Sequence, residues 1–417
     1  MRDGKWTDDE FLDRLRLSTD EPANRALEEM RIAEVSSADT ARLFKLLTEY
    51  DSPLPDDTPE PIRQFLATTR AHRDDIVGSL DIARIQRGTE LFRTFAAQAC
   101  VVMLASSLPS GYSAPCLTEV LVISDQLRRH PYRRLMGVVQ MLVDMAQPFE
   151  DLNDSRSLVT AQKLRLLHAG VRSVVDKVKP EYRATYGSPV NHEDMLATIM
   201  GFSYLVIEGI RRLDVELRLE QVEDFWYGWS QFSRLMGIHP IGEPLSEAFI
   251  PQSYEEAATF YGSYVRRHFE TDPAKNPQGV MLARRNLELM RGWIPTWMRW
   301  CGLGFAPAVA VEHVLGREGM ARVGLSAPPS LPGLRWALDR LLRLVVRSER
   351  RHPDFFSRLT GLILQGMIDE ALGGRITFLI PMSVTDMQSL SDKDGPAVAR
   401  KSLQDIFSWN CDEEEVS

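Results

Sequence analysis

The sequence predicts an all-α protein that forms one large helical domain with helical additions at both ends. Long stretches place apolar residues at helical spacing, most clearly at residues 91–108, 160–177 and 219–236. Alternating apolar and polar runs joined by hairpin turns, the pattern of β-strands, do not stand out. The chain also lacks a GxGxxG sequence after a strand and a P-loop, which are typical of nucleotide-binding α/β folds.

The individual helices follow from local patterns. Residues 18–21 offer side chains that cap a helix start. The nearly all-apolar stretch 91–108 predicts a central buried helix that ends in a sharp turn at residues 109–115. A second capping sequence at residues 191–194 predicts a helix that continues towards Leu213.

Four segments divide the chain. Residues 1–60 form an N-terminal helical extension that ends in a linker rich in proline and acidic residues. Residues 61–275 form the core, and residues 276–390 form a C-terminal helical part that packs on it. Residues 391–417 form a polar, acidic tail.

The composition excludes several classes of protein. The 417 residues are 44% hydrophobic and 26% charged, as in a soluble globular protein. A net charge of -9 argues against broad nucleic-acid binding, because no excess of cations is present to neutralise phosphates. The four cysteines lie far apart without CxxC spacing, which argues against a zinc ribbon or a disulfide framework and favours a reducing compartment.

The start of the chain predicts a cytoplasmic location. The first ten residues are polar and acidic and lack the apolar centre of a signal peptide. No stretch reaches about 18 uninterrupted apolar residues, so a membrane-spanning helix is not indicated.

The helix at residues 160–177 carries the most unusual pattern. His168 lies on an apolar stripe, with Arg165 three residues before it and Arg172 four residues after it on the same face. The stripe consists of Leu164, Val171 and Val175. One interpretation is a structural histidine with two arginines in ion pairs. The other is a neutral imidazole that ligates a metal or haem iron, with the arginines placed to meet anionic groups such as propionates.

The spacing of the histidines limits the kinds of metal centre that the chain could form. None of the eight forms an HExxH pair, and the acid-rich ExxH motifs on paired helices that a di-iron centre needs are missing. A GxSxG sequence is also missing, which argues against a serine hydrolase. A metal centre would therefore rely on a single histidine and a large cofactor. Haem meets that demand, since the macrocycle supplies four of the ligands.

A basic amphipathic segment at residues 334–351 has two interpretations. It combines apolar residues with six arginines. It is either a surface helix of the bundle or a face that contacts a membrane surface peripherally, which would suit an enzyme whose substrate partitions into lipid.

Four stretches in the same order resemble the MpaB/rubber oxygenase family. Residues 165–172, Arg-Leu-Leu-His-Ala-Gly-Val-Arg, are similar to its RxxHAxVR signature. Residues 104–115, 191–203 and 223–238 are similar to neighbouring family segments. The resemblance covers roughly residues 88–270.

The resemblance implies an all-helical, partly globin-like core that holds haem b. His168 would be the axial ligand of the iron, and Arg165 and Arg172 would support the haem or its propionates. Dioxygen would be the co-substrate. The characterised members add dioxygen to a carbon–carbon double bond of an isoprenoid chain and split it into two carbonyl fragments.

The sequence departs from the family on the expected distal side of the haem. Rubber oxygenases carry an RxxKT arrangement on the helix before the signature. Here the arginine is present as Arg134, but Gly137 and Val138 replace the lysine and the threonine. The catalytic acid of the family would fall at Glu119. Arg134 and Glu119 are therefore the catalytic candidates.

The sequence thus predicts a haem b-dependent oxygenase that acts on an apolar small molecule, for example by cleaving a C=C bond of an isoprenoid-like substrate. The changed distal positions leave two alternatives open. One is a helical protein that binds haem or a lipid-like ligand without catalysis. The other is a related haem enzyme that performs hydroxylation, desaturation or peroxide chemistry.

Overall fold

The computed structural model describes residues 3–36, 56–123, 156–239, 249–292 and 303–328, with single positions between 294 and 340. Every regular element in this part of the chain is a helix, which confirms the all-α class. The N-terminal elements are η1 (Asp3–Thr7), α1 (Asp9–Leu17), α2 (Glu21–Ile32), α4 (Glu60–Val77), α5 (Ile82–Thr94), α6 (Ala96–Val102), η2 (Met103–Ser107), α7 (Leu108–Gly111) and α8 (Pro115–Ile123).

The remaining elements follow after the undescribed residues 124–155. They are α11 (Arg156–Val178), α12 (Tyr182–Tyr186), α13 (His192–Phe202), α14 (Tyr204–Arg212), α15 (Leu219–Leu235), α16 (Tyr254–His268), η4 (Pro273–Lys275), α17 (Pro277–Gly292), η5 (Leu303–Phe305) and α19 (Ala306–Arg322).

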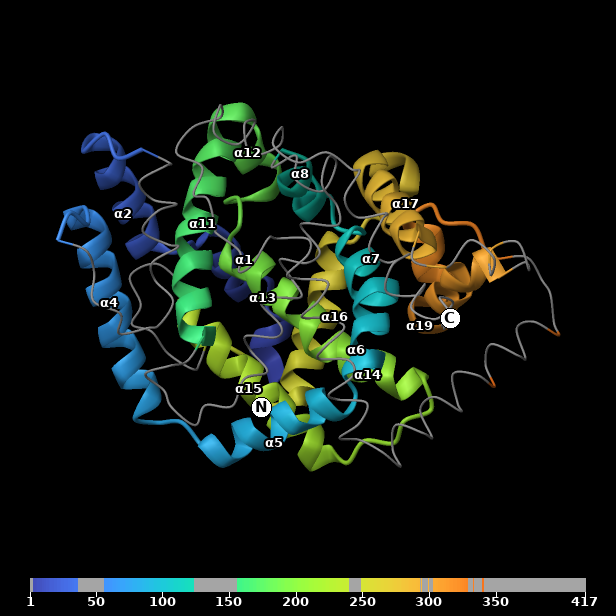
Figure 1. The fold of residues 1–417 in the computed structure, drawn as a ribbon. Coiled ribbons are helices and arrows are strands. Elements are labelled where there is room, and N and C mark those ends of the chain that lie inside the picture. Colours follow the sequence, from blue (N-terminus) through green and yellow to red (C-terminus); the bar gives the residue numbers. More distant parts are fainter. Residues whose placement is uncertain are drawn as a thin grey trace, which may run out of the picture.

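The first helices begin where the sequence supplies capping carboxylates. Asp8 accepts a hydrogen bond from the backbone of Glu10 at 3.0 Å and starts α1. Asp20 accepts one from the backbone of Ala23 at 3.3 Å and starts α2. Helix α1 packs on α13, and α2 packs on both α4 and α11. Figure 1 shows α2 and α4 along one side of the molecule, outside α11.

The predicted single helix at residues 91–108 is wrong, because the chain bends inside it. Phe95 leaves helical geometry (φ -115°, ψ 29°), and the helix before it lies at 76° to the one after it. A π-helical turn follows, in which the backbone N–H of Leu108 donates to Met103 five residues earlier. Pro109 lacks an N–H, yet the chain stays helical to Gly111, so the predicted turn at residues 109–115 starts too early.

The predicted helix from residue 191 towards Leu213 is also divided. Asn191 caps its start, as expected, by accepting a hydrogen bond from the backbone of Asp194 at 2.8 Å. Ser203 then leaves helical geometry (φ -117°, ψ -80°), and its hydroxyl donates to the carbonyl of Ile199 at 2.7 Å. The break separates α13 from α14 and lets them turn different faces to the core.

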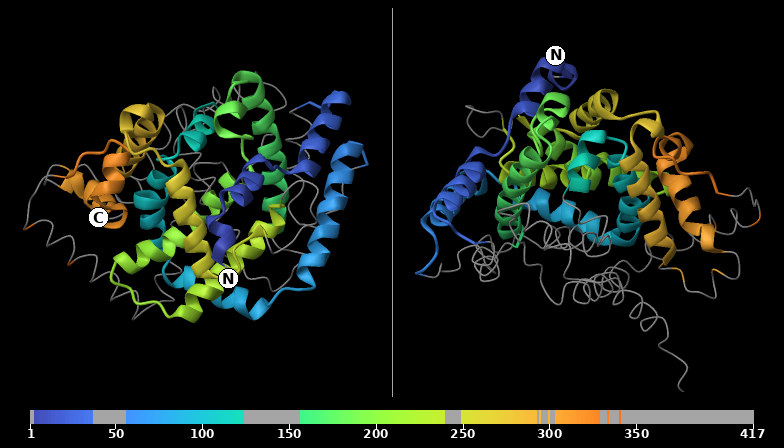
Figure 2. Two further views of the ribbon diagram at one scale, coloured as in Figure 1. Left: turned by 180° about the vertical axis from the view of Figure 1, so that it is seen from behind. Right: turned by 90° about the horizontal axis from the view of Figure 1, so that it is seen from above.

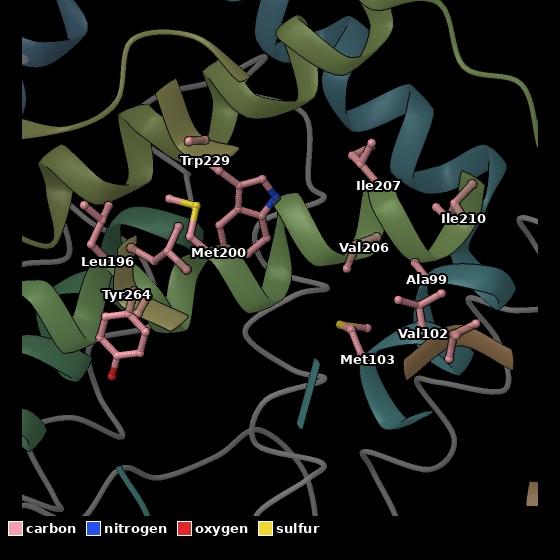
Figure 3. Packing of buried hydrophobic residues seen from close by; sticks show 14 of the residues in the cluster. Ala99, Val102, Met103, Leu196, Met200, Val206, Ile207, Ile210, Trp229 and Tyr264 are labelled. Carbon is pink, nitrogen blue, oxygen red and sulfur yellow. The ribbon is translucent and has the colours of Figure 1, made fainter. Parts of the chain in front are cut away.

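The main hydrophobic core lies between α6, α13, α14, α15 and α16. Figure 3 shows Leu196 and Met200 of α13 beside Trp229 of α15, with Val206 and Ile207 of α14 nearby. The Trp229 ring stacks on Phe202 with centroids 5.9 Å apart. Trp226 and Trp229 are therefore core residues, while the tryptophans at positions 293, 297 and 300 lie outside the described residues.

A second, smaller core fixes the position of α11. Leu166 and Ala169 of α11 pack against apolar side chains of α2 and α4, including Ala23, Leu27 and Phe65. One face of α11 is thereby buried under the N-terminal helices. The opposite side turns towards the main core, which Leu164 contacts.

Helices α5 and α15 approach each other so closely that the contact point on α5 has no room for a Cβ atom. Gly88 makes this possible, because a Cβ at this position would lie 2.6 Å from the backbone oxygen of Asp224. The Asp224 carboxylate accepts hydrogen bonds from Arg84 at 2.8 Å and from Arg87 at 2.6 Å. The ion pairs and the small residue hold the two helices together.

Helices α17 and α19 pack on each other at the side of the molecule opposite α2 and α4, as Figure 2 shows from two further directions.

No single described helix is long and apolar enough to cross a membrane; only the bent pair of residues 82–111 passes that test, by length and composition. Residues 334–351, apart from position 340, lie outside the described residues.

Candidate functional site

The signature helix α11 presents different chemistry on neighbouring faces. At 100° per residue, Arg165 and Arg172 lie about 20° apart around the helix, and His168 lies about 40–60° from them. Both arginines are buried against the N-terminal helices, whereas His168 is half-buried. Leu164, Leu167 and Val171 are half-buried as well, so the histidine sits on a partly covered apolar face.

Arg165 is fixed by a two-point ion pair with Asp20. Its Nε lies 2.6 Å from Oδ2 and its Nη2 lies 2.9 Å from Oδ1 of Asp20. The Arg165 and Asp20 side chains are only 2% and 1% exposed. Gly237 lies against the guanidinium, where a Cβ would be 2.9 Å from Nη2, and its φ of +71° also suits glycine.

The charge of Arg165 controls the protonation of Asp20. Burial by itself would raise the pKa of the Asp20 carboxyl, but the charge and hydrogen bonds of Arg165 outweigh it and lower the pKa to about 2. Asp20 is therefore ionised at neutral pH and compensates the buried cation. The same carboxylate caps α2, so one side chain performs two structural tasks.

Arg172 makes a second contact with α2, two turns along α11. Its Nε donates to Oδ1 of Asn24 at 2.8 Å, and its Nη1 donates to the carbonyl of Val190 at 3.2 Å. Burial lowers the pKa of Arg172 to about 10, which still leaves the guanidinium charged at neutral pH. Within the described residues its Nη2 has no hydrogen-bond partner.

These contacts show which sequence-predicted residues the structure brings together. His168, Arg165 and Arg172 share one helix, and the arginines use Asp20, Asn24 and backbone carbonyls as partners. The ion pair of Arg165 agrees with one of the two sequence interpretations of this cation. Two roles stay predictions: support of a haem by Arg165 and Arg172, and ligation of its iron by His168.

The two predicted catalytic residues lie away from these contacts or outside the described chain. The carboxylate of Glu119, on α8, pairs with Nζ of Lys179 at 2.7 Å, just beyond the C-terminal end of α11. Lys179 comes eleven positions after His168, which corresponds to roughly 16 Å along the helix axis. Arg134, Gly137 and Val138 lie outside the described residues. The catalytic roles of Glu119 and Arg134 stay predictions.

Sequence reasoning missed the partners that the N-terminal segment contributes. Asp20 was recognisable as a helix cap, but nothing in its local pattern indicated an ion pair with a residue 145 positions later. The backbone of the segment contributes too, since Ser18 accepts a hydrogen bond from the N–H of His192 at 3.0 Å. The contact between α1–α2 and α11–α13 is a tertiary feature.

A second buried polar cluster lies at the start of α13. Arg16 of α1 donates from Nη1 to Glu193 at 2.8 Å and to Asp194 at 3.1 Å. The hydroxyl of Tyr264, labelled in Figure 3, donates to Asp194 at 2.7 Å. Burial would raise the pKa of Glu193, but hydrogen bonds from His268 and Arg16 lower it below its ordinary value. Glu193 is therefore held as an anion beside the Arg16 guanidinium of α1.

Fold and site together define an all-helical protein whose signature helix carries one half-buried histidine between two buried arginines. The family described as ER-bound oxygenase mpaB/B'/Rubber oxygenase, catalytic domain, matches residues 88–348. That range is more than half of the chain, and the chain belongs to this family. The resemblance drawn from the four sequence stretches is thereby confirmed.

The fold is similar to that of a solved latex clearing protein. The structure of Latex Clearing Protein LCP in the closed state superposes with a TM-score of 0.59 at 18% sequence identity. The match covers 79% of this chain and 90% of that chain. At this identity the likeness shows the fold alone. No curated protein matches the sequence.

Proposed function

We propose that this protein is a haem b-dependent oxygenase that acts on an apolar small molecule. The reaction we expect is oxidative cleavage of a C=C bond in an isoprenoid-like substrate. The observation that carries the proposal is the match to an oxygenase family over residues 88–348, which contain the signature helix with His168.

The residues of α11 fit a haem group. A single imidazole, half-buried among Leu164, Leu167 and Val171, offers one nitrogen ligand in apolar surroundings. The macrocycle itself would supply the other four nitrogens, so the protein needs no cluster of ligating side chains. A bound haem would supply the iron at which dioxygen is activated.

The protein's own contribution would be to hold the imidazole and to exclude water. Arg165 and Arg172 anchor α11 to α2 on one side, and the apolar core adjoins it on the other. A rigid ligand helix preserves the geometry between iron and substrate. A dry, apolar environment suits an alkene and protects reactive species from water.

Absorption spectroscopy with a matched histidine variant tests the cofactor. Purified full-length protein should show a Soret band after haem addition, and His168→Ala should lose or shift it. His313→Ala is the control, because His313 is exposed on α19, away from the signature helix, and should leave the band unchanged. A folded wild-type protein that takes up no haem would contradict the proposal.

Oxygen uptake separates the oxygenase from the two alternatives. Farnesol and squalene are suitable alkenes, and we expect oxygen consumption with carbonyl products that mass spectrometry identifies. Haem-loaded protein that binds these compounds without consuming oxygen would indicate a carrier. Hydroxylated or desaturated products would indicate the related haem chemistry that Gly137 and Val138 leave open.

A further inference from the structure

The N-terminal segment lies outside the residue range that matches the family, but its side chains contact the signature helix α11. The family match begins at residue 88, whereas the partners of Arg165 and Arg172 are Asp20 and Asn24. These contacts bracket His168, since the two arginines are seven residues, or about 10 Å, apart along α11. We propose that Asp20 is a positioning residue, which sets the orientation of α11 and thereby of the His168 imidazole; this rests on the proposed haem function.

The Asp20–Arg165 contact is suited to fixing rotation of α11 about its axis. Two parallel hydrogen bonds, at 2.6 and 2.9 Å, align the planes of carboxylate and guanidinium. Neither side chain has freedom to move, because both are almost fully buried and Gly237 closes the space behind the guanidinium. A rotation of α11 would therefore break a desolvated ion pair.

The Arg172–Asn24 contact provides the second point of attachment. One contact would leave α11 free to pivot, whereas two contacts on the same face, two turns apart, fix its tilt as well. Arg172 also binds the carbonyl of Val190 at 3.2 Å, which ties α11 to the loop before α13. His168 lies between the two anchors and follows the helix that carries it.

The N-terminal segment is itself held firmly enough to serve as an anchor. Arg16 binds Glu193 and Asp194 at the start of α13, and Ser18 accepts the hydrogen bond from His192. Asp20 begins α2, whose apolar side packs under α4 and α11. The Asp20 carboxylate thus connects the ligand helix α11 to a segment that is itself fixed, and not to a loose terminus.

The variant Asp20→Asn isolates the charge. Asparagine has nearly the same shape and caps helices as well as aspartate, so α2 keeps its start. Arg165 would lose its counter-charge in a desolvated site, and the contact that orients α11 would weaken. The matched control is Asp224→Asn, which removes a buried carboxylate whose hydrogen bonds go to Arg84 and Arg87 of α5.

Two measurements on the full-length protein test the proposal. Hydrogen–deuterium exchange of the haem-free protein should speed up in peptides from residues 156–178 in Asp20→Asn but not in Asp224→Asn. Transfer of haem to apomyoglobin should become about tenfold faster in Asp20→Asn, by analogy with partners that orient metal ligands. The electron paramagnetic resonance spectrum of the ferric protein should also change, as a reoriented imidazole alters the ligand field.

The outcomes separate the two proposals. Faster exchange in α11 with faster haem loss and a changed spectrum supports the positioning role. Faster exchange with unchanged haem loss and spectrum, in a protein whose wild type holds haem, overturns it and leaves Asp20 a purely structural residue. Wild-type protein that takes up no haem overturns the proposed function, and the positioning role with it.

Discussion

The backbone N–H of His239 donates a hydrogen bond to Nδ1 of His192 at 3.3 Å, and the two imidazole rings stack with centroids 5.8 Å apart. His192 is fully buried, and its Nδ1 must carry a lone pair to accept this bond. The His192 ring is therefore neutral in the folded protein. Burial, together with the nearby charge of Arg172, lowers its pKa to about 3.

The protein should lose stability as the pH falls below about 6.5. Unfolded His192 takes up a proton near its ordinary pKa of 6.5, whereas the folded form stays neutral down to about pH 3. The unfolded state thus binds more protons in this window, which should cost about 2 kcal/mol between about pH 7 and pH 5. Burial also lowers the pKa of His72 and His239, which contribute with the same sign.

Urea unfolding at several pH values, with wild type and His192→Gln, measures this dependence. The variant should be less stable at neutral pH, because the stacking is lost, but its stability should vary less with pH. An equally steep dependence in the variant would contradict the assignment to His192.

Gly88→Ala should destabilise the protein by about 2 kcal/mol, within the range for overpacked contacts. The new Cβ would meet the backbone oxygen of Asp224 at 2.6 Å, and a backbone atom cannot move aside without separating α5 from α15. Gly228→Ala on α15 is the control, since among the described residues no atom outside its own stretch of helix lies within 4 Å of its Cβ position. That change should raise stability by about 0.5 kcal/mol through helix propensity. Thermal or urea unfolding measures the stability of the two variants. An equal change in the free energy of unfolding in both would disprove the close packing at Gly88.

Arg16→Met should destabilise the protein by about 3–5 kcal/mol. The change removes a cation from Glu193 and Asp194, whose side chains are buried at the start of α13. The control is Arg183→Met, which breaks a pair with Asp176 on the surface, where the two side chains are 53% and 32% exposed. Its effect should stay within about 1 kcal/mol.

Urea titrations at neutral pH distinguish the two arginine variants. Arg267 of α16 also donates from Nε to Glu193, at 3.2 Å. A loss in Arg16→Met no larger than that of Arg183→Met would show that Arg267 compensates Glu193 without Arg16. Far-ultraviolet circular dichroism before each titration establishes that both variants keep their helices.

Local sequence patterns predicted helices well but missed the places where they break. Apolar spacing indicated a helix over residues 160–177, and α11 covers it. The bends at Phe95 and Ser203 were not predicted. No glycine or proline lies within five residues of Phe95, and Gly201, two residues before Ser203, is compatible with a continuous helix. Such bends follow from how neighbouring helices pack, and local propensity is too weak to resist that.

Only part of the candidate site could be predicted from the sequence, because its other part also depends on tertiary packing. The order of the signature residues within one helix follows from 3.6 residues per turn, so His168, Arg165 and Arg172 could be placed near one another. Their partners could not, because Asp20 and Asn24 come from a distant segment. A carboxylate in a capping motif has the same local sequence whether it faces water or a buried arginine.

The sequence by itself determined the helical class, the family and the histidine-bearing helix, since these depend on short-range periodicity and on motif residues. The tertiary structure alone decided that the N-terminal helices close over α11 and that Asp20 compensates Arg165 there. The physical reason is burial. An arginine on a solvated helix needs no particular partner. One that is 2% exposed, as Arg165 is, requires hydrogen-bond acceptors or an opposite charge in contact, and only the folded chain determines which residue provides them.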